Sequence, residues 1–467
     1  MLLYHYRSVK NALLEIENGT LHFSAREDLN DPLEGYVRVF WQGDKAAWEG
    51  LFRNYICSLS QALDIYLVQG DEDTLRKKSL LVDLHRFDDL PLGSKLKELG
   101  EQFLNNEKVR STAEFYGGHA YRVQEKELKW ILLQIHGEAM QILIRYYRDT
   151  KFVPRAEAES ILQGFPGEDN STFSDNQKLL EGLDPSVREC FFGQVAAIVK
   201  DMHDFYYLQL GLEEDGFLYS SQKNGKKEAA RMKRKWLSVA VDFPNLYIEQ
   251  LKAMLYPESF IVCFSGMNND SSMWGTYADN HRGVCLIYET DEENCLHVKG
   301  GQAYNMEAKP VIYGGERIER NFFETFGRLT YNQVRDWLTG TEGLSSCMES
   351  FSDRDVWRSR YWEVDSAKTY RKMKEWEHEC EYRIAYSNFL GTMDSEENRN
   401  LKIDPKQLKG IIFGMHTAEQ DRKRLFEKLL LNAGNYAHIK FYQAEYDEER
   451  QSISVREKTI WSLRRSS

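Results

Sequence analysis

The sequence predicts an α+β protein in which a mixed or antiparallel sheet is split by a large, all-helical insertion. Short apolar stretches rich in β-branched and aromatic residues, typical of strands, occur near the N-terminus and again after residue 258. Between them, apolar residues recur every three to four positions, as in helices. We therefore expect residues 1–43 and 258–467 to form one α+β domain and residues 44–257 to be the helical insertion.

The N-terminal part begins with a strand-like stretch, "LLYHY", followed by a helical stretch from Val9 to Asn18 that Gly19 ends, and then by a second strand, "LHFS". Because side chains alternate along a strand, His5 shares a face with Leu3, and Tyr4 shares the other face with Tyr6. A single histidine in this position is either a buried core residue or part of a site.

A turn is predicted next at Asn30-Asp31-Pro32, because Asn and Asp side chains bond readily to nearby backbone groups. Glu34 follows this turn, and it has two potential ion-pair partners in the same segment, Arg26 and Arg38.

The insertion contains one strongly periodic helix whose apolar face is predicted to be buried. That face consists of Leu128, Leu132, Ile135, Ala139, Ile142 and Tyr146. A basic stretch at 223–236 carries seven Lys or Arg and one Glu, so it is either a solvated helix face or a contact for nucleic-acid phosphates. The insertion as a whole is expected to serve target recognition or assembly into an oligomer or with a partner.

The C-terminal part contains six further strand-like stretches separated by helices, the latter expected near 319–338 and 417–433. The strand-like stretches are "IVCFS", "VCLIY", "VIYG", "EYRIAYS", "IIFGM" and "HIKFYQAEY".

Composition narrows the classes of function. With 42% hydrophobic and 29% charged residues, the 467-residue chain can bury a large core. An excess of 73 Asp and Glu over 61 Lys and Arg argues against binding nucleic acid over its whole surface. The N-terminus does not resemble a secretion signal and no apolar run is long enough to span a membrane, so a cytoplasmic protein without membrane contact is expected. Seven scattered cysteines indicate reduced thiols rather than disulfides, and no metal site is expected.

Ring side chains with polar groups gather in "MWGTYADNHRGVCLIYE", where Trp274, Tyr277 and His281 precede Gly283 and a buried strand. Rings that both stack and form hydrogen bonds favour a pocket for a planar ligand, and a well-packed structural corner is the alternative.

Two carboxylates occur in "KEWEHECEYRIAY". If the strand begins near Glu379, then Glu379, Glu381 and Arg383 share one face, with the carboxylates about 7 Å apart. That spacing would allow the two carboxylates to bind one ligand at two positions. An ion-pair ladder of these glutamates with Arg383 and Lys372 is the structural alternative.

Four stretches together resemble, in order, a bacterial domain-of-unknown-function family numbered 2971, over residues 4–36 and roughly 260–447. The stretches are "LYHYRS…LHFS…LNDPLEG", "CFS…MWGTYADNHRGVCLIYE", "KEWEHECEYRI" and "LKGIIFGMHT". This family implies no activity.

The first strand, with its histidine, the following helix, Gly19 and the short strand ending in Ser also resemble the start of ADP-ribosyltransferase-like domains, which include DNA-modifying toxins and tRNA phosphotransferases. This resemblance implies that fold and NAD as the substrate. It implies that His5, or failing it Arg7, bonds the adenosine ribose of NAD and that Tyr277, or in its place Trp274, stacks on nicotinamide. His281, in the same ring-rich stretch, is a further candidate for contacting NAD.

The same resemblance assigns the chemistry to Glu381 and Glu379. Glu381 would stabilise the ribose as it becomes cationic, and Glu379 would polarise the acceptor. Glycine loops of the types GxGxxG and GxxxxGK are absent, which disfavours a Rossmann dehydrogenase or an ordinary nucleotide kinase.

Three functions are therefore weighed. The first is an NAD-dependent ADP-ribosyltransferase, a bacterial toxin or anti-phage defence effector that modifies a protein or nucleic acid. The second is a non-catalytic sensor module that binds a nucleotide or a protein. The third is a nuclease-like or phosphotransfer activity on RNA that uses the same His and Arg without NAD.

Overall fold

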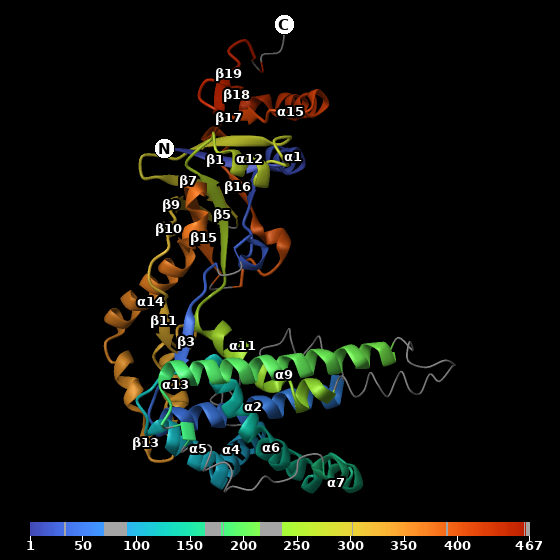
Figure 1. Cartoon of the computed structure of the whole chain (residues 1–467), viewed down its shortest axis with the longest axis vertical. Coiled ribbons are helices and arrows are strands. Elements are labelled where there is room, and N and C mark those ends of the chain that lie inside the picture. Colours follow the sequence, from blue (N-terminus) through green and yellow to red (C-terminus); the bar gives the residue numbers. More distant parts are fainter. Residues whose placement is uncertain are drawn as a thin grey trace. The chain divides into compact units, whose positions relative to one another are not determined.

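The computed structural model describes residues 1–31, 34–69, 91–163, 179–180, 182–214, 236–300, 302–388, 391–461 and 463 (Figure 1). The chain divides into two compact units. We call the first the sheet unit, made of Met1–Val37, Pro257–Ile318 and Trp362–Ser467. The second, the helical unit, consists of Arg38–Tyr256 and Glu319–Tyr361.

The sheet unit contains both helices and a mixed sheet, as the α+β expectation required. Its main sheet has eight strands in the order β19-β18-β17-β6-β1-β5-β15-β9. All neighbours are antiparallel except β17 and β18, which run parallel. In chain order the strands are β1 (Leu2–Arg7), β5 (Ser259–Ser265), β6 (Val284–Glu289), β9 (Lys309–Pro310), β15 (Glu381–Ser387), β17 (Leu408–Phe413), β18 (Lys440–Asp447) and β19 (Ser452–Glu457).

Two smaller sheets belong to the same unit. A four-stranded sheet joins β2 (Thr20–His22), β16 (Asn400–Ile403), β7 (Cys295–Lys299) and β8 (Ala303–Glu307), and a parallel pair joins β10 (Ile312–Tyr313) and β14 (Arg371–Lys372). The helices of this unit are α1 (Val9–Asn18), α12 (Ser271–Tyr277), α15 (Glu419–Leu431) and α16 (Ala433–Tyr436), with 3-10 turns at Arg26–Asp28, Lys374–Glu379 (η5), Glu396–Arg399 and Pro405–Gln407.

The two faces of the eight-stranded sheet are covered differently. One face carries the larger core cluster, in which Leu3 of β1 packs with Ile16 of α1 and Leu425 of α15. The other face carries a smaller cluster, in which Tyr6 of β1 packs with Trp274 of α12. Alternation along β1 therefore sends neighbouring residues into different environments.

The local signals around α1 predicted it well. Ser8 caps its first turn by accepting a hydrogen bond from the Asn11 amide, and Gly19 ends it with a φ of 59°. A left-handed residue at this position is the usual way for a helix to stop, and glycine adopts it without steric cost.

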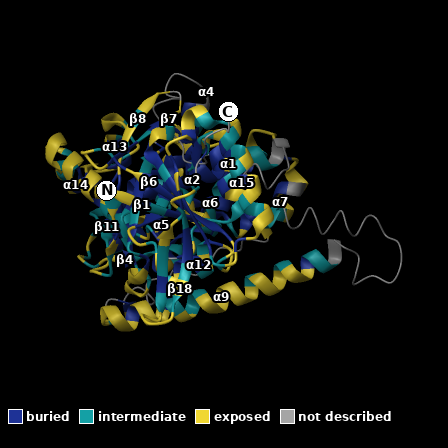
Figure 2. Cartoon of the chain, turned by 90° about the horizontal axis from the view of Figure 1, so that it is seen from above, coloured by how far each residue is buried: buried dark blue, intermediate teal, exposed yellow. Residues whose placement is uncertain are grey.

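The helical unit is mostly α-helical, and Figure 2 shows that much of α9 is exposed. Its helices are α2 (Lys45–Gln69), α4 (Pro91–Leu104), α5 (Glu107–Gly117), α6 (Glu125–Asp149), α7 (Arg155–Gln163), α9 (Pro185–Glu214), α11 (Phe243–Leu255) and α13 (Tyr331–Trp337). The helix α14 (Arg354–Thr369) runs from this unit into the sheet unit.

The predicted buried face of α6 is only partly right. Four of its six members are buried, but Leu143 and Tyr147 are buried in place of their neighbours Ile142 and Tyr146. Helices pack against α6 along a broad face, so the buried set is wider than a single stripe.

The helical unit also contains strands that the sequence did not predict. β3 (Arg38–Trp41) pairs with β4 (Val123–Gln124) and runs parallel to β11 (Glu319–Asn321). The segment 319–338, expected to be one helix, is therefore β11, a 3-10 turn at Phe322–Glu324 and the short α13. β12 (Thr339–Gly340), β13 (Gly343–Leu344) and a 3-10 turn at Ser346–Phe351 follow.

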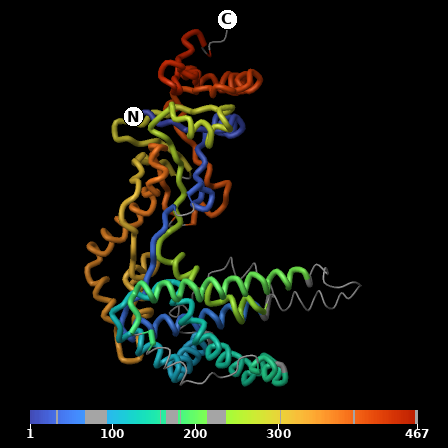
Figure 3. Tube along the Cα trace, viewed as in Figure 1, coloured from blue at the N-terminus to red at the C-terminus, as the bar shows by residue number. Residues whose placement is uncertain are grey.

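Figure 3 shows that each unit is assembled from segments that are far apart in the sequence. The start of the chain, in blue, and its end, in red, both contribute to the sheet unit, where β1 lies between β5 and β6. The helical unit takes one segment from between β2 and β5 and another from between β10 and β14.

Candidate functional site

The register of three neighbouring strands decides which sequence-predicted residues can meet. Ser265 of β5 lies opposite Tyr4 of β1 on one side and opposite Glu381 of β15 on the other. Directly opposed residues of antiparallel strands point to the same face. Tyr4, Ser265 and Glu381 therefore share one face of the sheet, and His5 points to the opposite face.

A turn before β15 brings Glu379 towards Glu381. Glu379 is the last residue of η5, and Cys380 follows it in a left-handed conformation with a φ of 44°. The hydroxyl of Ser265 donates to the Glu379 carbonyl at 2.8 Å, and the Gly266 amide donates to the Cys380 carbonyl at 2.8 Å. These bonds fix the turn to the end of β5, so that Glu379 enters the site from outside the strand.

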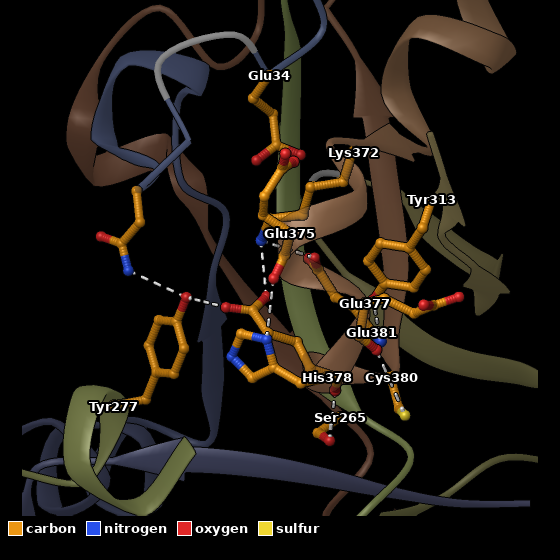
Figure 4. Close-up of polar contacts among 12 residues, drawn as sticks. Glu34, Ser265, Tyr277, Tyr313, Lys372, Glu375, Glu377, His378, Cys380 and Glu381 are labelled. Carbon is orange, nitrogen blue, oxygen red and sulfur yellow. Dashed lines mark hydrogen bonds and ion pairs between the residues drawn. The ribbon is translucent and has the colours of Figure 1, made fainter. Parts of the chain in front are cut away.

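Both glutamates meet on one lysine, Lys372, whose polar contacts are drawn in Figure 4. The Nζ of Lys372, on β14, donates to Glu379 Oε2 at 2.7 Å and to Glu381 Oε2 at 3.1 Å. The same ammonium group lies 4.9 Å from the centre of the Trp376 ring. One cation thus joins two carboxylates that β15 and η5 supply separately.

Arg383 completes the ionic network from the same strand. Its Nε and one terminal nitrogen donate to the two oxygens of Glu381 at 2.8 and 3.0 Å, and its other terminal nitrogen donates to the Thr369 carbonyl at 2.6 Å. Glu34 forms a further ion pair with Arg383. All of these charged side chains are buried, and we call Glu34, Lys372, Glu379, Glu381 and Arg383 the charged cluster.

The carboxyl groups of Glu381 and Glu34 in the charged cluster have pKa values shifted in opposite directions. Burial opposes the ionisation of Glu381, but Arg383 and Lys372 outweigh it and hold the pKa of Glu381 below its usual value. Burial raises the pKa of Glu34 to about 6, although Arg383 pulls it the other way. At neutral pH, Glu381 is therefore firmly ionised, whereas Glu34 lies closer to its titration range.

Tyr277, at the end of α12, is the aromatic residue that borders the charged cluster. Its hydroxyl donates to Glu379 Oε1 at 2.7 Å and accepts a bond from the Asn30 side chain at 3.0 Å (Figure 4). Burial and the neighbouring Glu379 raise the pKa of Tyr277, so the phenol stays protonated and remains a donor. Asn30 is exposed, and the Tyr277 ring is half-buried, so this side of the cluster borders solvent-exposed residues.

This arrangement contains the ion-pair ladder that the sequence offered as the structural alternative. Glu379 and Glu381 pair with Lys372, and Glu381 pairs with Arg383. The predicted spacing of about 7 Å assumed a strand that already includes Glu379. β15 begins at Glu381, and the left-handed turn at Cys380 brings the two carboxylates onto a single ammonium group.

His5 and Arg7 lie away from the charged cluster, which corrects their assignment to the same site. Both contact Glu15 of α1: His5 Nδ1 lies 3.4 Å from Glu15 Oε2, and Arg7 Nε lies 2.6 Å from Glu15 Oε1. His5 also packs against Phe264, whose ring centre is 4.9 Å away. Burial and the adjacent Arg7 lower the pKa of His5, so it is a neutral core histidine.

Trp274 and His281 also lie outside the charged cluster. Trp274 is fully buried, packs edge-on against Tyr6 at 5.1 Å and donates its Nε1 hydrogen to the Asn268 carbonyl. His281 has a φ of 64°, its amide donates to the Trp274 carbonyl, and its ring lies 6.2 Å from that of His416. Of the ring-rich stretch, Tyr277 contacts the cluster, and Trp274 forms a structural corner.

Sequence reasoning gave other roles to three residues of this site. Asn30 was assigned to a turn, Glu34 was paired with Arg26 or Arg38, and Tyr313 was only part of a strand. The Tyr313 hydroxyl accepts the Glu381 amide hydrogen at 2.7 Å, and Glu34 pairs with Arg383. A polar run beside a predicted turn, "LNDPLEG", was the available signal for the first two.

The basic stretch 223–236 lies outside the described residues except for Trp236, whose ring is 5.7 Å from that of Tyr66. Within the described ranges, no group of three His, Cys, Asp or Glu is placed to hold a metal ion, and the seven cysteines are free thiols. No helix in the described part of the chain is long and apolar enough to cross a bilayer.

The comparisons with known proteins bear on the same segment. A family model described as "Protein of unknown function (DUF2971)" matches residues 273–384. The match supports the predicted resemblance over that segment. It contains Tyr277, Lys372, Glu379, Glu381 and Arg383, so most of the site falls within it, and Asn30 and Glu34 do not. None of the curated proteins and none of the solved structures compared with the chain gives a match.

Proposed function

We propose that the charged cluster and Tyr277 form the centre of an enzyme that transfers ADP-ribose from NAD to a macromolecular acceptor. The observation that carries the proposal is the meeting of two glutamates, two residues apart, on Lys372 beside a tyrosine ring. The likeness of the N-terminal strand, helix and second strand to ADP-ribosyltransferase-like domains adds to it.

The chemistry requires an ionised carboxylate next to the sugar. When the bond between nicotinamide and ribose C1′ breaks, neutral nicotinamide leaves and positive charge develops on the ribose. The lowered pKa of Glu381 keeps it negative at neutral pH, so it can stabilise this charge. Lys372 and Arg383 hold the carboxylate in one orientation, which lowers the cost of reorganisation during the reaction.

Glu379 and Tyr277 have complementary roles in this proposal. Glu379 accepts the proton of the acceptor as the acceptor's oxygen or nitrogen bonds to ribose C1′. Tyr277 stacks on nicotinamide and orients the leaving group. Because Asn30 is exposed and bonds Tyr277, NAD enters on this side and displaces the bond between Tyr277 and Glu379. His5, Arg7, Trp274 and His281 have no role in this site.

Nicotinamide release by the full-length chain tests the proposal. The chain is incubated with NAD labelled in nicotinamide, alone and with bacterial protein, RNA or DNA as acceptor. We expect release by the wild type and a loss of about 100-fold or more in Glu381→Gln, since a carboxylate that faces a developing charge contributes on the order of 3 kcal/mol.

Glu377→Gln is the matched control, because Glu377 lies in the same segment and forms an exposed pair with Lys374. It should keep full activity, and circular dichroism should show that both variants are folded. A wild-type chain that releases no nicotinamide with any of these acceptors contradicts the proposal. If Glu381→Gln still releases nicotinamide, the proposed activity is retained, but Glu381 is not its catalytic residue.

One observation favours a second candidate, a non-catalytic module that binds a nucleotide or a protein. Lys372 and Arg383 already neutralise both glutamates, and all members of the charged cluster are buried. Such a closed network stabilises one conformation without chemistry. Calorimetry that shows NAD binding, together with the absence of nicotinamide release, would support this function instead. The third hypothesis, RNA chemistry by His5 and Arg7, is not taken further because both contact the buried Glu15, away from the charged cluster.

A further inference from the structure

A cavity lies where two strands of the sheet unit diverge, and we call it the edge cavity. Its volume is about 440 Å³, which is within the range of ligand pockets, roughly 300–1,000 Å³. One wall is the end of β15, at Ala385 and Ser387, and the other wall is β8, at Asn305 and Glu307. Three tyrosines also line it: Tyr304, Tyr370 and Tyr386.

The edge cavity arises because the segment 303–310 pairs with two sheets in turn. The end of this segment is β9, which pairs with β15 and places Lys309 opposite Arg383. Its beginning is β8, which pairs instead with β7 of the four-stranded sheet. In the described part of the chain, the pairing on this side of β15 therefore stops at Arg383, and Ala385 and Ser387 lie beyond it.

The end of β15 directs main-chain groups towards the edge cavity. Successive residues of a strand in an antiparallel sheet point their N–H and C=O groups to opposite edges. The Cys380 carbonyl accepts from an amide at the end of β5, whereas the Glu381 carbonyl accepts from the Val311 amide on the β9 side. Counted in steps of two from Glu381, the N–H and C=O groups of Ala385 and Ser387 also point away from β5.

The wall formed by β8 is directed in the same way. The carbonyl of His297, on β7, accepts from the Asp404 amide on the side away from β8. Asn305 lies opposite His297, so its own N–H and C=O groups point away from β7, and so do those of Glu307 two residues later. Both walls therefore present main-chain donors and acceptors at the two-residue repeat of a strand, about 6.6–6.8 Å.

An extended peptide is the ligand that fits this arrangement. N–H and C=O groups that repeat along a strand edge are complementary to another strand, and peptides bind exposed sheet edges in this way. The edge of a second sheet would bring a neighbouring strand of its own, which β8 would block. We propose that the edge cavity binds a single extended segment of a partner protein, which pairs antiparallel with β15 in continuation of β9.

The tyrosines indicate which side chain the peptide carries at its centre. The rings of Tyr304 and Tyr386 are in contact, with their centres 5.6 Å apart, and both residues are half-buried. A peptide residue opposite Tyr386 places its side chain on the same face as these rings. Aromatic and β-branched side chains make the favourable pairs with an aromatic residue across two strands. The bound segment therefore has such a residue opposite Tyr386, and the residues on either side of it bond Ala385 and Ser387.

Selection of phage-displayed random hexapeptides on the immobilised full-length chain tests the peptide site. We expect the selected peptides to share one aromatic or β-branched residue and to bind the chain with micromolar affinity in fluorescence anisotropy. N-methylation of the two residues that flank the shared residue should weaken binding, because it removes the amide hydrogens that bond β15. N-methylation of the shared residue should have the smaller effect, since its amide points away from β15.

Ser387→Pro tests the same contact from the side of the protein. The Ser387 amide points away from β5, so proline removes an edge donor and leaves the bonds to β5 in place. We expect the affinity for the selected peptides to fall at least about fivefold, which corresponds to about 1 kcal/mol for one hydrogen bond. Ser387→Ala is the matched control: it keeps the amide, loses only the hydroxyl contact with Asp365, and should bind the peptides like the wild type.

Glu457→Pro is a second control, at the opposite edge of the same sheet. Glu457 lies on β19, and its amide points outward because the amide of the next residue, Lys458, bonds the Phe441 carbonyl. Its substitution should leave peptide binding unchanged.

Three results would overturn the proposal. One is that no selected peptide binds the wild type with a dissociation constant below about 100 μM. Another is that the peptides bind Ser387→Pro as tightly as Ser387→Ala, or lose more affinity when the shared residue is N-methylated than when its neighbours are. The third is self-association of the wild type that Ser387→Pro abolishes, which would assign the edge to a second copy of the chain. Peptide binding is measured without NAD, so its outcome does not depend on the transferase activity.

Discussion

The eight-stranded sheet carries two groups of ionisable side chains, one on each face. On the face covered by α1, Glu15 holds Arg7 and His5. On the other face lies the charged cluster, in which Lys372 and Arg383 hold three glutamates. Adjacent residues of one short strand, Tyr4 and His5, point to opposite faces of the sheet. Two residues that are adjacent in a strand therefore need not belong to the same site, because side chains alternate between the two faces of a sheet.

The two groups also differ in the balance of charge. Two cations face three carboxylates in the charged cluster, and burial, to which the nearby Glu381 adds, raises the pKa of Glu34. On the α1 side, a single carboxylate faces Arg7 and the neutral His5, and its pKa falls to about 2. The difference predicts opposite dependences of stability on pH.

The largest expected effect is at Arg383. Arg383→Leu removes the cation that pairs with Glu34 and Glu381, so Glu34 loses this ion pair and Glu381 keeps only Lys372. We expect the free energy of unfolding to fall by about 3–5 kcal/mol in urea titrations at neutral pH. Arg456→Leu, which breaks an exposed pair with Glu445, should cost less than about 1 kcal/mol. If the two variants lose similar amounts of stability, the buried ion pairs of the charged cluster contribute no more to stability than an exposed ion pair does.

The α1 side should be the more acid-sensitive. Burial opposes the ionisation of Glu15, yet Arg7 and His5 lower its pKa to about 2 from 4.5. A lowered folded-state pKa gives stability that is present above 4.5 and is lost as the pH falls through 2. We expect this loss to be on the order of 2–3 kcal/mol in the wild type and to be absent in Glu15→Gln. Parallel stability curves for the two proteins between pH 4.5 and 2 would refute the assignment.

The smallest effect, of opposite sign, is expected at Glu34. Burial raises its pKa to about 6, so the folded protein binds a proton more tightly than the unfolded chain. Stability from this group is present below 4.5 and is lost as the pH rises through 6, by up to about 2 kcal/mol. Denaturant titrations of Glu34→Gln should not show that decline. A wild-type stability that rises between pH 4.5 and 6 relative to the variant would contradict it.

Local signals made α1 and most strands predictable from the sequence. Ser8 and Gly19 mark the ends of α1, and runs such as "EYRIAYS" become strands in the structure. The segment 319–338 was predicted wrongly because β11 exists through its pairing with β3, about 280 residues earlier in the chain. No local pattern carries that information.

The candidate site was predictable in part, for similar reasons. Glu379, Glu381, Lys372 and Arg383 were recognised together because they lie within one short stretch. The left-handed conformation of Cys380 and the facing of His5 depend on bonds to β5 and on the strand register, so they could not be read from the residues themselves.

The position of β1 has a consequence for the biosynthesis of the protein. Residues 2–7 leave the ribosome long before their partners on both sides, which lie at 265 and 284–289. At translation rates of about 5–20 residues per second, the first strand waits on the order of tens of seconds for its neighbours. During that interval most of the helical unit emerges, so it has the opportunity to fold while the edges of a hydrophobic strand remain open to chaperones.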